Sequence, residues 1–239
     1  MEAAERQAAL AALEIIEWQG RPLETARAAA LLSESAAAPL AGDNRADVEN
    51  LPWAALRARV TTCTACELCH TRTQTVFGVG DPHARLMIVG EAPGAEEDRL
   101  GEPFVGPAGK LLDEMLFAIG LRREQVYICN ILKCRPPRNA DPTLEQASAC
   151  RPFLARQIAL VNPAVILAVG RIAAQNLLQS TTPIGRLRGE AHAFTLDPHR
   201  IAPVWVTYHP AYLLRSPAEK SRAWEDLKKV RSALEAVPS

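Results

Sequence analysis

Six cysteines are the residues of this sequence whose type and spacing point most directly to chemistry. Cys63 and Cys66 form a C-x2-C pair, and Cys134 and Cys150 form a C-x15-C pair. A close pair presents two thiolates to one site, and a second pair from elsewhere in the chain completes a set of four ligands. Four sulfur ligands suit zinc or an iron–sulfur cluster equally well. Spacing alone does not choose between the two.

The other two cysteines are less clearly placed. Cys69 extends the first run to C-x2-C-x2-C, so the ligands from that segment are not uniquely fixed. Cys129 follows apolar residues in an expected strand, which favours a buried structural thiol. No export signal is visible in the sequence, and disulfides rarely persist in the cytoplasm. We therefore expect a cytoplasmic protein whose cysteines bind a metal group.

Three loops carry the remaining candidates. The segment 90–98, GEAPGAEED, follows an apolar run, and its glycines let backbone N–H groups approach a ligand closely. Asn130 ends a second apolar run and precedes a loop that contains Lys133 and Arg135. His209 begins the segment 209–215, HPAYLLR, directly after a third run. Each loop alone is weak evidence, but the three together predict a site.

Alternating strands and helices are expected to position these loops. Apolar runs predict strands over 85–89, 126–129, 164–169 and 204–208, and helical spacing predicts helices over 107–119, 171–178 and 218–236, with another opening at Thr143. This order predicts an α/β fold of three layers, αβα, around a central four-stranded, mainly parallel sheet. Ligands bind beyond the carboxyl ends of such strands. The loops 90–106, 130–142, 170–171 and 209–217 are the expected lining.

Composition favours a globular protein with an appendage. Of the 239 residues, 48% are hydrophobic and 23% charged, and the net charge is zero. Residues 1–50 hold nine acidic and four basic side chains, so the rest of the chain is mildly basic and can meet DNA. We expect residues 1–50 to form an Ala-rich acidic extension with a helix near 8–18, and 51–239 one catalytic domain. The longest apolar stretch is broken by Asn162-Pro163, so no membrane span is expected.

Together, the motifs resemble the family 4 uracil-DNA glycosylases, the bacterial and archaeal iron–sulfur type often called UDGa. The resemblance runs from about Thr62 to Lys228 and rests on GEAPGAEED, PFVGPAGKLLDEML, NILKCRPP, the C-x15-C pair and HPAYLLR. It implies the uracil-DNA glycosylase fold and a monofunctional enzyme of base-excision repair. Such an enzyme flips uracil out of DNA and hydrolyses the N-glycosidic bond to leave an abasic site. It also implies a structural [4Fe–4S] cluster with the ligands Cys63, Cys66, Cys134 and Cys150.

The resemblance further implies how the base is held. Phe104 is similar to the aromatic residue that stacks on the flipped base, and Asn130 to the amide that reads its Watson–Crick edge. His209 resembles the histidine that donates to uracil O2 as negative charge grows there. Backbone N–H groups of the Glu91-Ala92 turn are expected co-donors. In isolation, Phe104 would be read as a core aromatic and Asn130 as a strand-end residue.

Water activation is not settled by the resemblance. Ala92 stands where the best-known uracil glycosylases carry an aspartate that orients water, as is usual in family 4. Glu91 and Glu97 are the carboxylates near this position, with Asn139 as a polar partner for Glu97. Glu97 is alternatively expected to exclude the thymine methyl group by its bulk.

DNA contacts are expected beside the pocket. Leu213 and Leu214 are candidates to fill the gap left by the extruded base, although both also suit a helical core. Arg215, Lys133 and Arg135 are expected at phosphates. The expected partners are uracil-containing single- and double-stranded DNA, the expected state is a monomer, and a replication partner such as a sliding clamp stays open.

Two rival interpretations remain. One is the related uracil-DNA binder that traps its product covalently through a histidine in an extra basic loop; the segment 135–143 contains no histidine. The other is a non-catalytic, cluster-bearing DNA-binding module. Asn130 and His209 argue against it, since binding alone requires neither.

Overall fold

The computed structural model describes residues 48–197 and 200–237, and the following account concerns these residues. The expected helix near 8–18, and all but the last three residues of the expected extension, lie outside them. Within the described part, no helix is long and apolar enough to cross a membrane.

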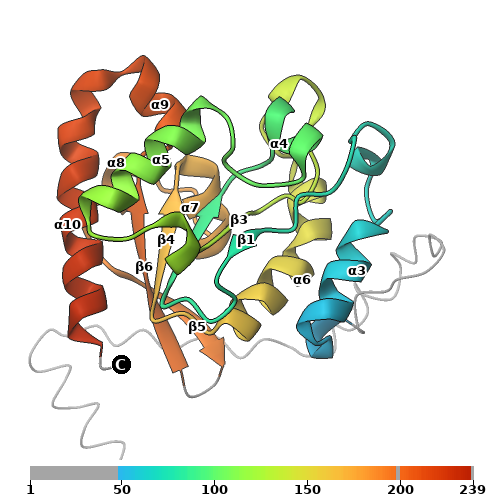
Figure 1. Ribbon diagram of the computed structural model, residues 1–239, viewed down its shortest axis with the longest axis horizontal. Helices are drawn as coiled ribbons and strands as arrows, with labels where there is room; N and C mark the ends of the chain where they lie inside the picture. The colour runs from blue at the N-terminus through green and yellow to red at the C-terminus, as the bar shows by residue number, and fades with distance from the viewer. Residues whose placement is uncertain (1–47, 198–199, 238–239) are drawn as a thin grey trace, which may run out of the picture. The chain divides into compact units, whose positions relative to one another are not determined.

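A six-stranded sheet forms the centre of the fold (Figure 1), in the order β1-β3-β2-β4-β6-β5. The strands β3, β2, β4 and β6 run parallel, while β1 and β5 pair antiparallel at the two edges. The strands span Val79–Gly80, Leu86–Gly90, Tyr127–Asn130, Val165–Val169, His192–Asp197 and Arg200–Thr207 in chain order. The four expected strands are thus confirmed as the parallel centre. The expected number was too small, because both edge strands were missed.

The central strands are apolar throughout because both of their faces are covered. Met87 and Val89 of β2 pack on one side of the sheet, and Leu86 and Ile88 pack on the other. Successive side chains of a strand point to opposite faces, so a buried parallel strand reads as a continuous apolar run.

Helices cover the two faces and complete the three expected layers (Figure 1). On one face lie α6 (Leu144–Val161) and α7 (Arg171–Leu178), and on the other lie α5 (Pro107–Ala118), α9 (Pro210–Arg215) and α10 (Lys220–Ala236). The expected helix start at Thr143 is confirmed by a capping box, in which the Thr143 hydroxyl accepts the Gln146 N–H at 3.2 Å and the Gln146 amide oxygen accepts the Thr143 N–H at 3.1 Å. This box fixes the point at which the chain leaves the 130–142 loop.

A smaller layer carries the cysteine pair Cys63 and Cys66. The helix α3 (Trp53–Thr61) packs against α6 through a separate apolar cluster that includes Leu56, Val60 and Phe153. Short elements fill the connections: α4 (Ala95–Leu100), α8 (Ile184–Leu187) and the 3-10 turns Val48–Asn50, Glu67–His70, Arg123–Gln125, Pro137–Asn139 and Pro217–Glu219. The packing of α3 on α6 brings the first cysteine pair toward Cys150, which lies on α6.

Candidate active site

A cleft of about 420 Å³ opens where the loops after β2, β3 and β6 meet. As the parallel topology requires, these loops share the carboxyl edge of the sheet. The cleft is lined by seven of the expected site residues, namely Glu91, Ala92, Glu97, Phe104, Asn130, His209 and Arg215. Leu213, Leu214, Lys133 and Arg135 are not among its lining residues.

Asn130 presents an unused acceptor to this cleft. The residue is 2% exposed, and its Oδ1 has no hydrogen-bond partner among the described residues. Its register partner across the sheet is Gly90. A Cβ atom at Gly90 would lie 2.6 Å from Phe104 Cζ and closer still to Asn130 Oδ1. The absence of a side chain at position 90 is therefore what allows the amide and the Phe104 ring to approach each other.

Phe104 is held in a conformation that aromatic residues rarely adopt. Its φ of 55° lies in the left-handed region, which costs on the order of 1–3 kcal/mol. Arg123 stabilises this backbone, because its guanidinium donates to the Phe104 carbonyl at 3.1 Å, to the Pro103 carbonyl, and to Asp113 Oδ1 at 3.2 Å. A side chain at Gly109 would collide with the same Phe104 carbonyl. The ring is thus placed by contacts from several directions.

His209 is oriented by the start of α9. Its Nδ1 accepts the Ala211 backbone N–H at 3.1 Å. A backbone N–H can only donate, so Nδ1 is unprotonated and the neutral ring carries its proton on Nε2. Burial and, to a smaller extent, Arg215 together lower the pKa of His209 to about 4, against an opposing effect of Glu97. The ring is therefore a neutral donor near pH 7.

The faces of the His209 ring are also fixed. Phe104 stacks on it with ring centroids 5.6 Å apart and planes 28° apart. A Cβ atom at Gly170 would lie 3.0 Å from His209 Cβ and 3.3 Å from its Cδ2, and the φ of Gly170 is +98°. Only glycine fits this position without strain. Gly170, in the loop after β4, thus allows the main chain to pack closely against His209.

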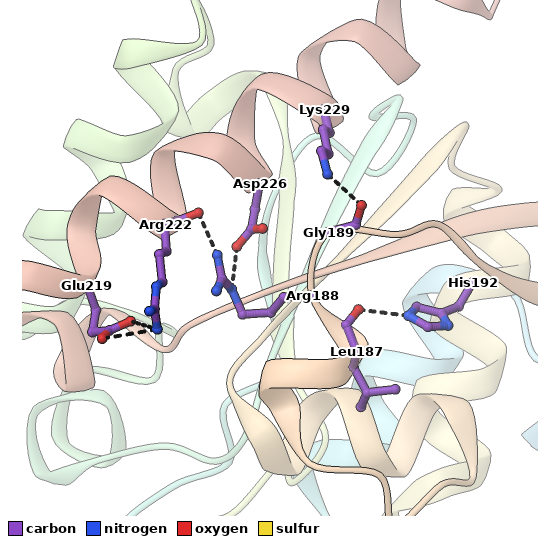
Figure 2. Close-up of polar contacts among 8 residues, drawn as sticks. All are labelled: Leu187, Arg188, Gly189, His192, Glu219, Arg222, Asp226 and Lys229. Carbon is purple, nitrogen blue, oxygen red and sulfur yellow. Dashed lines mark hydrogen bonds and ion pairs between the residues drawn. The ribbon is translucent and has the colours of Figure 1, made fainter.

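A buried ion pair holds the strand end that precedes His209. Figure 2 shows Arg188, whose Nε donates to Asp226 Oδ2 at 2.7 Å and whose Nη2 donates to the Arg222 carbonyl at 2.5 Å. The side chains of the pair are 10% and 3% exposed. The Arg188 guanidinium also lies over the ring of Tyr208, 4.2 Å from its centroid. These contacts of Arg188 were not predicted from the sequence.

Glu91 is the carboxylate with the most perturbed acidity. Burial and, to a smaller extent, nearby Asp141 together raise the pKa of Glu91 to about 7, against an opposing effect of Arg171. Arg171 itself pairs with Asp141 at 2.7 Å. The Glu91 backbone is anchored, since its carbonyl accepts the Leu132 N–H at 3.0 Å. A carboxylate of this kind can take up a proton near neutral pH.

Glu97 is engaged in a different way. One carboxylate oxygen accepts the Gly94 N–H at 3.0 Å, and the other accepts the N–H groups of Val105 and Gly106 at 2.9 and 3.0 Å. These three bonds join the turn that opens α4 to the loop that follows Phe104. Asn139, the partner expected for Glu97, instead accepts from Arg135 Nε at 2.7 Å.

Two residues expected at the DNA surface are buried in the structure. Lys133 is 1% exposed, and its ammonium donates to the Asn130 carbonyl at 2.7 Å, so it cannot reach a phosphate in this arrangement. Leu213 is 1% exposed and packs in the core beneath α9, so it cannot enter a duplex. Leu214, by contrast, is 45% exposed. Of the two leucines, Leu214 alone has the exposure that a wedge requires.

The four expected ligand cysteines meet at a second, very small cavity. It is lined by Cys63, Cys66, Cys134 and Cys150 together with Arg72 and Lys133. Arg72 Nη1 donates to Cys134 Sγ at 3.1 Å. Cys69 lines a neighbouring surface hollow, and Cys129 is fully buried in β3.

The sulfur donors around this cavity suit a thiolate-bound metal group. Within the described ranges, no three His, Cys, Asp or Glu side chains are arranged to hold one metal ion. Zinc requires all its sulfur ligands at about 2.3 Å, whereas a [4Fe–4S] cluster binds one thiolate per iron and leaves the sulfurs further apart. The donor set, four thiols beside two cationic side chains, suits a thiolate-bound group of negative charge.

Comparison with known proteins gives this architecture a class. Residues 77–228 match the family model described as the Uracil DNA glycosylase superfamily. The chain is 46% identical over 175 residues to the type-4 uracil-DNA glycosylase of Archaeoglobus fulgidus, covering 72% of this chain and 87% of that protein. It is 45% identical over 177 residues to the type-4 enzyme of Thermotoga maritima, with 73% and 90% covered. The chain belongs to the type-4 family of this superfamily.

Proposed function

We propose that this protein removes uracil from DNA by hydrolysing the N-glycosidic bond of a flipped uridine. It is a uracil-DNA glycosylase, a hydrolase of N-glycosyl bonds that acts in DNA repair. The observation that carries the proposal in this chain is the unpaired Asn130 Oδ1, which is buried in the wall of the cleft beside Phe104. A buried acceptor without a partner costs about 1–3 kcal/mol, so a ligand donor is expected there.

Uracil supplies the missing donor. Its N3–H can donate to Asn130 Oδ1 while its O4 accepts from the amide nitrogen. Cytosine presents the opposite pattern at both positions, so it would leave two buried polar groups unpaired. With Phe104 stacked on the base, one amide is sufficient to select uracil over cytosine.

His209 supplies the donor for the leaving group. Cleavage of the glycosidic bond places negative charge on uracil O2, and a neutral Nε2–H can donate to that oxygen. The N–H of Ala211 fixes the required tautomer through Nδ1. Backbone N–H groups of the Glu91-Ala92 turn act beside it. Because the ring is already neutral, no proton must leave it before the reaction.

The two glutamates divide the remaining work. Glu91 is the general base for water, since it lines the cleft and its raised pKa of about 7 makes it basic enough to accept a proton. Glu97 is a positioning residue, because its oxygens already accept three backbone N–H groups. It keeps the Gly94 turn and the Phe104 loop at a constant separation.

The cysteine cavity holds a [4Fe–4S] cluster with Cys63, Cys66, Cys134 and Cys150 as ligands. Bound there, the cluster crosslinks the segment before β1, the loop after β3 and the helix α6. The chemistry in the cleft proceeds without it, since each proposed step uses Asn130, His209 or Glu91.

DNA would be held around the mouth of the cleft. Arg215 lines the cleft and Arg135 lies on the neighbouring loop, where both can meet phosphates of a single or double strand. Leu214 is the proposed wedge that replaces the extruded base. The working unit is proposed to be a monomer.

One assay tests the activity against both rivals. The wild-type protein is incubated with single- and double-stranded DNA containing one uracil, and the products are resolved with and without alkali. Abasic sites are expected, whereas a covalent adduct would indicate the product-trapping relative and an unchanged strand a binding module. Asn130→Ala should lower uracil release by about a hundredfold, while abasic-site DNA still binds. Equal rates for both proteins would refute the assignment of Asn130.

A further inference from the structure

Lys133 connects the cysteine cavity to the residue that reads the base. It is 1% exposed, it lines the cavity of the four cysteines, and its Nζ donates to the Asn130 carbonyl at 2.7 Å. The other ionisable side chains that line this cavity are the four cysteines and Arg72. The same side chain thus touches two sites with different chemistry.

A buried ammonium needs a compensating charge. Removing one from water without an anion nearby is costly, and here the nearby groups that can carry negative charge are cysteine sulfurs. Four thiolates around a [4Fe–4S] cluster exceed the charge of its irons and sulfides, so the occupied cavity is anionic. The buried Lys133 side chain would therefore face a group of opposite charge across the cavity wall.

The Asn130 carbonyl, which accepts the hydrogen bond from Lys133, lies at the end of β3. This strand end is in the buried interior, where an acceptor requires a donor. The turn from Asn130 to Cys134 is also pinned to the loop after β2, because Ile131 N–H donates to the Gly90 carbonyl at 2.9 Å and Leu132 N–H to the Glu91 carbonyl at 3.0 Å. Displacement of this turn would therefore move the Asn130 side chain and the Gly90–Glu91 backbone together.

We propose that Lys133 is a positioning residue that couples the cysteine cavity to uracil recognition, with its charge balanced by the thiolate-bound group and its N–H fixing the main chain of Asn130. This inference rests on the proposed function and on a cluster in the cavity. Emptying the cavity or removing the ammonium should disturb the same amide.

Two variants separate the charge from the hydrogen bond. Lys133→Met removes both, while Lys133→Gln removes the charge and keeps an N–H donor; Lys220→Met is the matched control at an exposed lysine. Each protein is compared with wild type for iron content, for loss of cluster absorbance in a chelator, for single-turnover uracil release, and for affinity for abasic-site DNA. Lys133→Gln keeps the test available if Lys133→Met is not recovered folded.

Both Lys133 variants should lose the cluster faster than wild type, and Lys133→Met should release uracil at least about tenfold more slowly than Lys133→Gln. Affinity for abasic-site DNA should stay within about twofold, because phosphate contacts are untouched. Adding Lys133→Met to Asn130→Ala should cost little more than Asn130→Ala alone, since Lys133 acts through the Asn130 side chain.

Full additivity of the two substitutions, or a Lys133→Met protein with wild-type rate and wild-type cluster lifetime, would overturn the inference. Failure of the proposed function looks different. In that case the wild-type protein itself releases no uracil or contains no iron.

Discussion

Gly90→Ala tests the geometry of the base pocket with a single methyl group. The φ of Gly90 is not in the left-handed region, so alanine adds the methyl without backbone strain. That methyl would lie 2.6 and 2.7 Å from two atoms of the Phe104 ring, against about 3.5–4.0 Å for an ordinary carbon contact. It would be closer still to Asn130 Oδ1. Relief therefore requires a shift of about 1 Å by one or both side chains.

The surroundings limit how that shift can occur. Arg123 and Gly109 hold the Phe104 backbone, and Asn130 is fixed in β3 between two paired strands. Overpacking of this kind costs about 1–3 kcal/mol of folding free energy. A misplacement of about 1 Å at a reacting site can slow the reaction about a hundredfold. We expect a folded protein whose uracil release is slower by about that factor.

The assay is single-turnover uracil release from a single-stranded oligonucleotide, with urea unfolding and iron content measured on the same samples. Gly185→Ala is the matched control, because a Cβ atom there meets nothing within 4 Å and alanine suits its helix. The reasoning is refuted if folded Gly90→Ala releases uracil within about threefold of the Gly185→Ala rate.

Three further outcomes are expected. The wild-type rate should rise about tenfold per pH unit up to the Glu91 pKa of about 7 and then level off, because the base acts when deprotonated. Glu91→Gln should abolish this rise in a single-turnover pH profile. An unchanged profile in the variant would contradict the assignment of Glu91 as the base. Arg123→Lys should lower the free energy of unfolding by about 1–2 kcal/mol and slow uracil release, because lysine cannot donate to all three acceptors that Arg123 bonds. Urea titration measures the first effect and single-turnover rates the second. Wild-type values for both would show that the Arg123 contacts are not needed to hold Phe104. Cys150→Ser should lose iron and the absorbance at about 400 nm while Cys69→Ser keeps them, and the reverse result would exchange the ligands.

The four central strands were predictable because burial on both faces leaves continuous apolar runs in the sequence. The edge strands were not. The two-residue strand β1 is too short to show a pattern, and β5 alternates between exposed and half-buried residues on one edge of the sheet. The parallel order then predicted which loops would meet, and the structure brings those loops together at one cleft.

The contacts that hold the cleft residues in place could not be predicted from the sequence, because they join residues far apart in the chain. Arg123 reaches the Phe104 carbonyl from 19 positions away, and Arg188 meets Asp226 from 38 positions away, so no local spacing marks either contact. Lys133 was misplaced at the surface because an isolated lysine in a loop is usually exposed. Lys133 is buried beside Cys134 of the same turn and Cys150 of α6, and this proximity appears only in three dimensions.

The charges of the cleft bear on the alanine at position 92. Three backbone N–H groups already occupy the Glu97 carboxylate, and His209 is neutral, so Glu91 is the base that we propose for water. Its acidity is already weakened by burial and by Asp141. An aspartate at position 92 would add a second negative charge beside Glu91 and raise its pKa further, leaving less of the base deprotonated near pH 7. It would also oppose the negative charge that grows on uracil. If Glu91 is the base, Ala92→Asp should therefore slow uracil release near pH 7.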